Sequence, residues 1–467
     1  MKKGHIASEI TPCALGAESF KRAYNTKYAY YAGAMANGIS SAKMVIALGR
    51  EGYMCSYGAG AVPLHEVEQA IRQIKQELPQ GPYMINILHS QNDPAHEEAL
   101  VDLLLEQSVK AVEVSAFIEI SPAIIRYRLA GIKKSEDLGV YSENKIIAKI
   151  SREEVAKKFM SPPDPQIVEA LLAKNQITSE QAQWAKEIPV ADDITAEADS
   201  GGHTDGQPFI SLLPLMISCR DEIMQQFGYR QKIRVGAAGG ISTAVAAAGA
   251  FTMGADYIVT GSVNQGCAEA GTSDYVKEML ASVTMADVVM APSADMFEMG
   301  AKVQVIKKGT MFPMNAQKLY DLYTRHGSID ELSEKDKKAV EMRMLRHDIA
   351  AVWGFVEEYF AKADPKQLER AAVNPKLKMA LIFRWYLGNS SRWAIFGDDA
   401  RKMDMQIWCG KSMGAFNRWV SKTDLEHWKD RTVVKVADKI MSGAADVIAE
   451  GYREFAQITS EKKEKTI

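Results

Sequence analysis

Residues 233–261, IRVGAAGGISTAVAAAGAFTMGADYIVTG, decide the fold of this 467-residue chain. The stretch begins with the β-branched run IRVGAA and turns at the glycine pair Gly239 and Gly240. It continues as an alanine-rich segment of helical length and ends in a second apolar run, DYIVTG from Asp256. A short apolar strand, a glycine turn, a helix and another strand are the unit from which parallel sheets are built.

The same alternation of strand and helix occupies the preceding two hundred residues. Six further apolar runs are YAYYAG from Tyr28, YMCSYG from Tyr53, YMINIL from Tyr83, AVEVSA from Ala111, KIIAKI from Lys145 and DITAEA from Asp193. Amphipathic patterns lie between them, most clearly in LHEVEQAIRQIKQEL from Leu64. Eight strands that alternate with helices predict an α/β fold with a parallel sheet, and eight strands close a (β/α)8 TIM barrel. A doubly wound open sheet is the alternative.

Changes in composition predict the domain boundaries. We expect an N-terminal segment at 1–27, a barrel at 28–290, a helical region at 291–460 and a charged tail at 461–467. The long gap at 151–191 carries helical patterns, which predict a helical insertion after strand 5 that forms part of a lid. Most of the tryptophans lie in the helical region. We therefore expect a C-terminal helical appendage that forms a substrate or lid domain.

Composition and charge exclude several classes of protein. Hydrophobic residues make up 47% and charged residues 25% of the chain, which excludes intrinsic disorder for most of it. A formal net charge of -3 does not indicate the excess of basic residues that is typical of nucleic-acid-binding proteins. Glycines and Asp256 interrupt the apolar stretch 245–263, which argues against a membrane span. Five scattered cysteines, and the lack of an apolar signal segment at 1–16, favour a cytoplasmic protein.

Two loops of the expected barrel favour phosphate binding. Gly239 and Gly240 follow the seventh strand, where we expect Ser242 to begin the next helix. Gly261 and Ser262 follow the eighth strand. Backbone amides at glycine turns and helix N-termini bind anions, and barrels often hold a phosphate at these two loops. The alternative is that both loops are ordinary glycine turns that bind no phosphate.

The loop EADSGGHTD after the sixth strand places His203 directly behind Ser200, Gly201 and Gly202. A histidine at the mouth of a barrel can take or donate a proton near neutral pH, and paired glycines leave room for a flat ring. A capped structural histidine is one alternative. An oxygen-rich metal site is another, with the nearby acids Asp192, Asp193, Glu197, Asp199 and Asp205.

Polar residues near the ends of three apolar strands complete the expected site: Asn86, Ser115 and Lys149. A lysine in a barrel strand is costly unless it is paired. It faces an electron-rich ring or an anion, or it forms a buried ion pair with Glu113 or Glu197. Together with the turn after the first strand, these residues would surround a flat, phosphorylated cofactor, and FMN fits that description. The turn consists of Gly33, Ala34 and Met35.

Nine longer motifs carry a resemblance to a known family. They are GAMANGIS, EADSGGHTD, VGAAGGI, GADYIVTGSVNQ, AEAGTS, PSADMFEMGAKVQV, KGTMFPMNAQKLY, FRWYLGNSSRWA and QIWCGKSMGAFNRWV. The chain resembles the PfaD-type family of trans-acting enoyl reductases, which serve polyunsaturated fatty acid and polyketide synthases. That family belongs to the flavin barrels that include nitronate monooxygenase. The resemblance runs from about residue 20 to about residue 450.

The resemblance implies an activity, cofactors and a partner. FMN would be bound without a covalent link, and NADPH would reduce it. The hydride would pass to the β-carbon of an α,β-unsaturated thioester on an acyl carrier protein of a polyketide or fatty acid synthase. We expect no nucleic-acid or membrane partner, and a homodimer only because dimers are common.

The resemblance also implies roles for individual residues. The first-strand turn Gly33, Ala34 and Met35 would lie against the flavin, and Asn86 and Lys149 would contact it. The loop residues Gly239, Gly240, Gly261 and Ser262 would bind its phosphate. His203 matches the histidine that handles a proton in nitronate monooxygenases. The expected catalytic residues are therefore His203 and Lys149. The chain departs from the wider superfamily at Ala34, where glycine is frequent, and at Ser262, where threonine is frequent.

Two other functions remain as alternatives. One is a flavin oxidase of the nitronate monooxygenase kind, and the other is a non-catalytic scaffold of a synthase assembly. A long acyl chain would need an apolar tunnel, which Trp385, Tyr386 and Trp393 could line. Core packing of an all-helical subdomain is the alternative for these three aromatic residues, and it is the favoured one.

Overall fold

The structure is a computed structural model that describes residues 10–89 and 93–464. It divides into two compact units. The barrel unit comprises Met1–Ser200, Asp205–Gly271 and Arg418–Ile467, and the second unit comprises Gly201–Thr204 and Thr272–Asn417.

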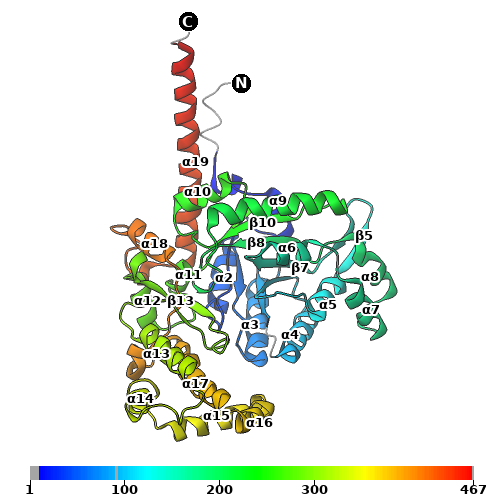
Figure 1. The fold of residues 1–467 in the computed structure, drawn as a ribbon. Helices are drawn as coiled ribbons and strands as arrows, with labels where there is room; N and C mark the ends of the chain where they lie inside the picture. The colour runs from blue at the N-terminus through cyan, green and yellow to red at the C-terminus, as the bar shows by residue number, and fades with distance from the viewer. Residues whose placement is uncertain (1–9, 90–92, 465–467) are drawn as a thin grey trace. The chain divides into compact units, whose positions relative to one another are not determined.

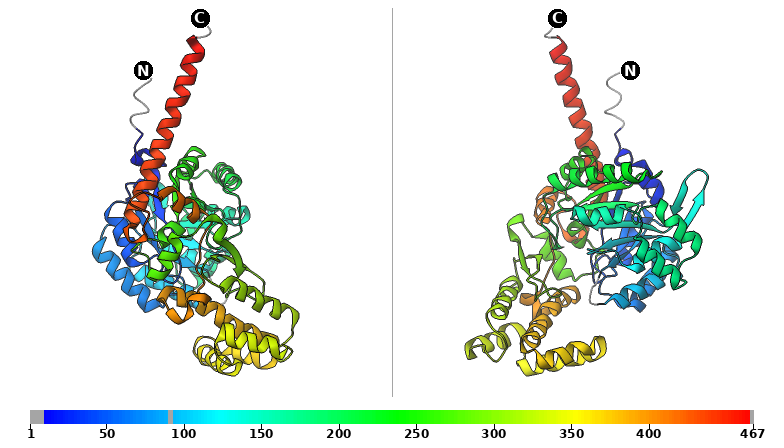
Figure 2. Two further views of the ribbon diagram at one scale, coloured as in Figure 1. Left: turned by 90° about the vertical axis from the view of Figure 1, so that its left-hand side faces the viewer. Right: turned by 45° about the vertical axis from the view of Figure 1, so that its right-hand side comes forward.

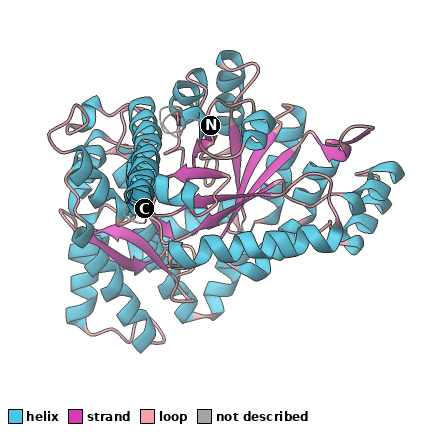
Figure 3. Cartoon of the chain, turned by 90° about the horizontal axis from the view of Figure 1, so that it is seen from above, coloured by secondary structure: helices cyan, strands magenta, loops and turns pink. Residues whose placement is uncertain are grey.

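Eight parallel strands close the barrel, in the order β1-β11-β10-β8-β7-β4-β3-β2. Figure 1 labels β7, β8 and β10 among these strands. Every run that the sequence predicted forms one of these strands, which confirms the (β/α)8 barrel and excludes the open sheet. Figure 3 shows the strands surrounded by helices. The strands are β1 (Tyr30–Ala32), β2 (Met54–Tyr57), β3 (Met84–Leu88), β4 (Ala111–Ser115), β7 (Lys145–Ile150), β8 (Asp193–Glu197), β10 (Arg234–Ala238) and β11 (Tyr257–Thr260).

Seven helices between the strands cover the outside of the barrel. The eighth position is filled from the C-terminus, because only the four-residue α11 (Ser262–Gln265) directly follows β11. The helix α19 (Val433–Glu464) packs against both α10 and α2. The seven helices are α2 (Ala42–Arg50), α3 (Leu64–Glu77), α4 (Pro94–Glu106), α5 (Pro122–Ala130), α6 (Glu153–Met160), α9 (Phe209–Phe227) and α10 (Ala244–Thr252).

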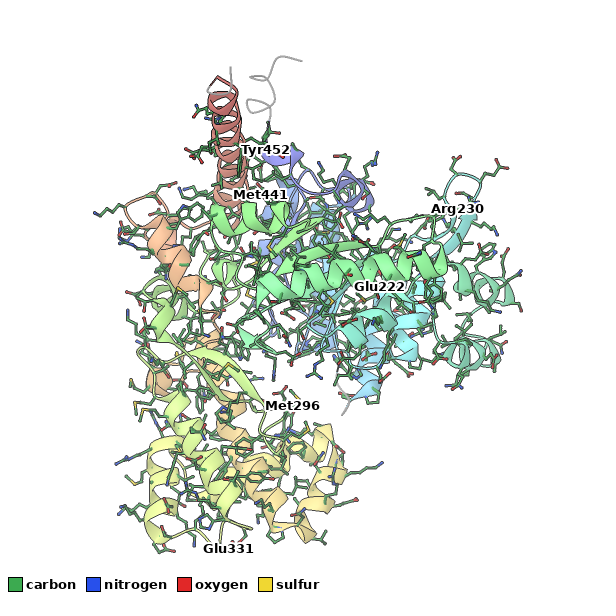
Figure 4. The ribbon with its side chains drawn as sticks, turned by 45° about the horizontal axis from the view of Figure 1, so that its top comes forward. Glu222, Arg230, Met296, Glu331, Met441 and Tyr452 are labelled. Carbon is green, nitrogen blue, oxygen red and sulfur yellow. The ribbon has the colours of Figure 1, made fainter. Side chains whose placement is uncertain are left out.

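One face of α19 is apolar and buried over its first half. Val436, Ile440 and Ala444 recur at helical spacing and are fully buried. Figure 2 shows α19 running alongside α10 and continuing past it. Figure 4 labels Met441, which is buried, and Tyr452 farther along the helix, which is exposed. The C-terminal residues therefore group with the barrel, whereas we expected them in the helical region at 291–460.

The helical insertion after the fifth barrel strand lies at the amino ends of the strands. The regular outer helix α6 comes first and packs on β7, β8 and α9. The additional helices α7 (Pro165–Ala173) and α8 (Ser179–Trp184) lead from α6 to β8 and pack on α5. Segments that lead from a helix to the next strand lie opposite the mouth of a barrel. The insertion is present as predicted, but the expectation that it forms part of a lid is wrong.

A short helix closes the amino end of the barrel interior. Helix α1 (Glu18–Tyr24) inserts Phe20, which is fully buried and stacks on Tyr257 with ring centroids 4.3 Å apart. Tyr24 and the guanidinium of Arg234 complete this layer. The remaining elements of the barrel unit are the hairpin β5 (Ile132–Ser135) and β6 (Gly139–Ser142) and the short 3₁₀ helices η2 (Pro12–Ala14), η3 (Ala185–Glu187) and η7 (Trp428–Asp430).

The second unit combines a small antiparallel sheet with helices. Its sheet has the order β12-β13-β9, so the region from 291 onward is not wholly helical. Helix α18 (Ser412–Val420) spans the boundary between the units. The other elements are β9 (Gly202–His203), β12 (Val288–Pro292), β13 (Lys302–Ile306), α12 (Asp274–Ala281), η4 (Met285–Asp287), α13 (Phe312–Arg325), α14 (Glu334–Ala339), η5 (Val340–Leu345), α15 (Ile349–Ala363), α16 (Pro365–Val373), α17 (Pro375–Phe396) and η6 (Asp399–Asp404).

The aromatic residues of α17 form part of the core of the second unit. Tyr386 is fully buried, and its hydroxyl donates to Asp404 at 3.1 Å. Trp385 and Trp393 pack against the same cluster. Core packing therefore explains the three residues that could have lined an acyl tunnel.

Two further sequence expectations concern the ends of the chain and membranes. The expected tail at 461–467 falls only partly within the described residues, because α19 continues to Glu464. No helix among the described residues has the length and apolarity needed to cross a bilayer.

Candidate active site

A buried ion-pair cluster lies near the carboxyl ends of three adjacent strands, β4, β7 and β8. The ammonium of Lys149 is 3.3 Å from a carboxylate oxygen of Glu197 and 3.9 Å from one of Glu113. Glu113 is fully buried, and Lys149 exposes 17% of its side chain. The structure thus contains both of the ion pairs that the sequence offered for this lysine.

The two carboxylates determine the ionisation of the lysine. Burial disfavours a charged ammonium, but attraction to Glu197 and Glu113 outweighs it and raises the pKa of Lys149. Lys149 is therefore a fixed positive charge at neutral pH near the mouth of the barrel. Such a cation can stabilise negative charge that develops on a bound ring or on a carbonyl oxygen.

Asn86 holds the strands next to the cluster together. Its amide nitrogen donates to the hydroxyl of Ser115 and to the backbone carbonyl of Glu113, both at 3.0 Å. The side chain is almost completely buried. Hydrogen bonds between β3 and β4 therefore occupy the amide donors of Asn86.

The turn after β1 is fixed by hydrogen bonds on both sides. The amide of Ala34 donates to a carboxylate oxygen of Glu113 at 2.8 Å, and the amide of Met35 donates to the hydroxyl of Ser40 at 3.0 Å. The amide of Gly33 donates to the carbonyl of Thr260 at 2.9 Å. These three amides are therefore occupied by hydrogen bonds within the protein. A ligand would contact the turn through its surface and not through these donors.

The loops after β10 and β11 leave open space beside their backbones. Gly239 and Gly240 both have positive φ angles, 81° and 79°. A β-carbon at Gly239 would lie 2.6 Å from the backbone of Ala198, so no larger residue fits there. A β-carbon at Gly240 or at Gly261 would meet no described heavy atom within 4 Å. Gly261 leads directly into Ser262 and α11.

The helix that follows Gly240 begins one residue later than expected. Thr243, rather than Ser242, is the N-cap of α10, and its hydroxyl accepts from the amide of Ala246 at 3.3 Å. Ser242 is instead buried. The helix N-terminus still lies directly after the glycine turn, which is the arrangement that binds anions.

The loop after β8 enters the second unit. Ser200 remains with the barrel and lies 3.4 Å from a carboxylate oxygen of Glu197. Gly201 packs closely on the backbone of Cys409 and Gly410, and Gly202 has a φ of 78°. Gly201 therefore serves close packing within the second unit, whereas a β-carbon at Gly202 would meet only the ring of Trp408 at 3.9 Å. The room for a flat ring beside these glycines stays a prediction.

His203 contacts a carboxylate within the second unit. It lies on β9, which pairs with β13, and its Nε2 atom is 3.0 Å from the carboxylate of Asp295. Burial opposes the ionisation of Asp295, but the hydrogen bond and the charge of His203, together with hydrogen bonds from Ser293 and from the backbone, outweigh it and lower the pKa of Asp295. The sequence did not reveal Asp295, because 92 residues separate it from His203. A carboxylate partner orients the ring and stabilises an imidazolium.

The acidic residues near His203 in sequence have other partners. Asp192 pairs with Arg128, and Asp193 pairs with Arg234 at the amino end of the barrel. Asp205 pairs with Arg152. Among the described residues, no three side chains of the metal-binding types lie close enough together to hold a metal ion.

A second histidine–carboxylate pair at the mouth was missed in the sequence. His89 directly follows β3, and its Nδ1 atom lies 2.8 Å from a carboxylate oxygen of Glu97 on α4. Glu97 is nearly completely buried and also accepts a hydrogen bond from Ser121. The sequence feature that could have indicated this pair is a polar residue directly after an apolar strand.

These features fit a flat, phosphorylated cofactor. The open backbones at Gly240 and Gly261 could admit a phosphate, and Lys149 could face an electron-rich ring. The buried hydroxyl of Ser56 on β2 has no hydrogen-bond partner among the described residues, so it remains free for a ligand. The residues present therefore suit FMN.

Comparison with known families gives two matches. Residues 18–331 match the nitronate monooxygenase family, and residues 326–405 match the inserted helical domain of acyl-carrier-protein S-malonyltransferase. The second match covers the helices α14 to α17 of the second unit.

Comparison with individual proteins gives relatives named for polyketide biosynthesis and for polyunsaturated fatty acid synthesis. The polyketide biosynthesis protein PksE of Bacillus subtilis is 46% identical over 98% of this chain, and one component of a Thraustochytrium polyunsaturated fatty acid synthase is 44% identical over 94%. The chain spans 59% and 30% of the lengths of these two relatives. The enoyl reductase domain of MlnA, from the macrolactin cluster of Bacillus amyloliquefaciens, has a TM-score of 0.90 and 40% identity. The match covers 95% of this chain and 99% of that domain.

The ion-pair cluster predicts a dependence of stability on pH. Removing one partner of a buried pair leaves unpaired charge, so Lys149→Met should lower the free energy of unfolding by about 3–5 kcal/mol near neutral pH. The pKa of Lys149 is raised in the folded chain. Its contribution is therefore complete below the unfolded-state pKa of about 10.4 and is lost as the pH rises through the folded-state value.

Urea unfolding followed by circular dichroism between pH 7 and pH 11 measures this effect. The difference in the free energy of unfolding between the parent and Lys149→Met should stay constant to about pH 10 and should become smaller at higher pH. Lys133→Met, which removes an exposed partner of Glu143, should cause no measurable change. Equal stability of the parent and Lys149→Met at pH 7 would contradict the assignment.

Proposed function

The chain belongs to the nitronate monooxygenase family of oxidoreductases, and from this premise we propose that it is an FMN-dependent enoyl reductase. Its substrate is an α,β-unsaturated thioester on an acyl carrier protein of a polyketide or polyunsaturated fatty acid synthase, its reductant is NADPH, and it acts in the cytoplasm. The observation that carries the proposal is the similarity to the MlnA enoyl reductase domain, which extends over both units of the chain.

The barrel mouth supplies the groups that would hold the cofactor. Gly239, Gly240, Gly261 and Ser262 would receive the phosphate, with the N-terminus of α10 beside it. The turn at Gly33, Ala34 and Met35 would lie against the ring, and Lys149 would supply a positive charge. Asn86 keeps β3 and β4 in register beside it.

The reaction adds a hydride and a proton across a carbon–carbon double bond. Bound FMN would supply hydride-transfer chemistry, with NADPH as the source of the hydride and the β-carbon of the thioester as its acceptor. Negative charge then develops on the thioester oxygen, and Lys149 is the candidate cation to stabilise it. The α-carbon must gain a proton, and His203, oriented by Asp295, is the candidate acid. The product is the saturated acyl thioester.

The second unit supports a carrier-protein substrate. Its residues 326–405 resemble a helical domain of an enzyme that transfers malonyl groups to acyl carrier protein. The similarity of the whole chain to a polyketide biosynthesis protein and to a component of a fatty acid synthase agrees with a partner of this class.

Anaerobic stopped-flow absorbance tests the proposed reaction directly. NADPH should bleach the flavin, and a crotonyl carrier-protein thioester added next should restore its absorbance. Oxygen consumption with a nitronate and without NADPH would favour a nitronate oxidase instead. A chain that holds no flavin and performs neither reaction would favour a scaffold.

Replacing the candidate acid should slow only the second half of the reaction. His203→Ala should keep its flavin and its rate of reduction by NADPH, but reoxidation by the thioester should slow by about 10²- to 10⁴-fold. His65→Ala, which removes an exposed histidine of the barrel unit, should behave like the parent. If His203→Ala stayed within a few-fold of the parent, another group would be the proton donor.

Blocking the phosphate turn should remove the cofactor. A valine at Gly240 would place its side chain in the space left for the phosphate, so Gly240→Val should purify without flavin. Gly228→Val is the matched control, because Gly228 also has a positive φ and open surroundings but ends the outer helix α9. The control should keep its flavin, and a yellow Gly240→Val protein with full flavin content would refute the assignment.

A further inference from the structure

We propose that the buried carboxylate of Glu113 lowers the reduction potential of the bound FMN through its negative charge and so makes the cofactor a stronger hydride donor. The inference depends on the proposed function, because it concerns the cofactor assigned to the barrel mouth. Glu113 lies on β4, and the sequence suggested it only as a partner for Lys149.

Glu113 is the centre of the hydrogen bonds at the mouth. One carboxylate oxygen accepts from the amide of Ala34 at 2.8 Å. The other accepts from the hydroxyl of Tyr31 at 3.4 Å and lies 3.9 Å from the ammonium of Lys149. One carboxylate thus joins the β1 turn, which would lie against the ring, to the cation that would face it.

The cluster carries more negative than positive charge. Two carboxylates, those of Glu113 and Glu197, surround the single ammonium of Lys149. The ammonium is closer to Glu197, at 3.3 Å against 3.9 Å, so Glu113 is the less compensated of the two. Ala34 and Tyr31 donate hydrogen bonds to Glu113 but bring no full charge.

Burial makes this excess charge effective. Glu113 is fully buried, and charges in the protein interior are screened far less than charges in water. Reduction of a flavin adds electrons to the ring, so a nearby fixed negative charge opposes it. Charge close to the ring is one of the means by which a protein sets the electronic properties of its cofactor.

A purely structural role for Glu113 makes a different prediction. If Glu113 only ties the β1 turn to β4, the length of its side chain matters and its charge does not. Glu113→Gln removes the charge but keeps a carbonyl oxygen that can accept from Ala34. Glu113→Asp keeps the charge and shortens the side chain by one methylene group.

Anaerobic titration of the holoenzyme against a reference dye measures the midpoint potential of each variant. Glu113→Gln should retain FMN and shift its midpoint to a more positive value. The expected shift is at least tenfold in the ratio of reduced to oxidised cofactor, which is about 30 mV for two electrons. Glu113→Asp should stay close to the parent. Asp193→Asn is the matched control, because it removes a buried carboxylate at the amino end of the barrel, where it pairs with Arg234 instead of the cluster.

Three results would overturn the inference. They are an unchanged midpoint in Glu113→Gln, an equal shift in Glu113→Gln and Glu113→Asp, or loss of FMN from Glu113→Gln alone, which would make Glu113 a binding group. An equal shift in Asp193→Asn would likewise remove the assignment to Glu113. Failure of the proposed function looks different, because the parent itself would then hold no FMN or resist reduction by NADPH.

Discussion

Closure of eight parallel strands into a ring is the constraint on which the rest of the structure depends. Closure gathers all the carboxyl ends at one rim, so residues from distant parts of the sequence meet there. Lys149, Glu113 and Glu197 come from three neighbouring strands and form one cluster. Burying any one of these charges alone would destabilise the folded chain, because the charge loses its hydration. The attraction between the opposite charges offsets this loss. The cluster is therefore a property of the closed barrel and not of any single segment.

The closed ring also explains how the two ends of the chain are used. The amino end of the interior is filled by Phe20 and Tyr24 of α1, and the ion-pair cluster lies toward the opposite, carboxyl end. The gap on the outer surface beside α10 and α2 is filled by α19. Seven outer helices of the barrel alternate with its strands. The eighth is the C-terminal helix α19, which follows the second unit in the sequence.

The fold could be predicted because its strands are short apolar runs with clear boundaries. Each run from Tyr28 to Gly261 became a barrel strand, and the helical pattern from Leu64 became α3. The lysine in β7 stood out because its neighbours are apolar, and both of its possible partners proved to be real.

The features that were missed depend on contacts between distant residues. Two of these contacts join segments about a hundred residues apart: the pairing of β9 with β13 and the contact of His203 with Asp295. No local sequence pattern predicts either of them. The place of α19 follows from an apolar face that fits α10, whereas its sequence shows only an amphipathic helix. The use of the Ala34 amide by Glu113 involves a backbone group, which a sequence does not display.

The cofactor content of the purified chain tests the central claim most directly. The chain should be yellow, or become yellow on addition of FMN, and acid or heat should release FMN in a ratio of about one per chain, as expected for a single site at the carboxyl face of the barrel. A chain that neither carries FMN nor takes it up when supplied would contradict the account of the barrel mouth as a flavin site.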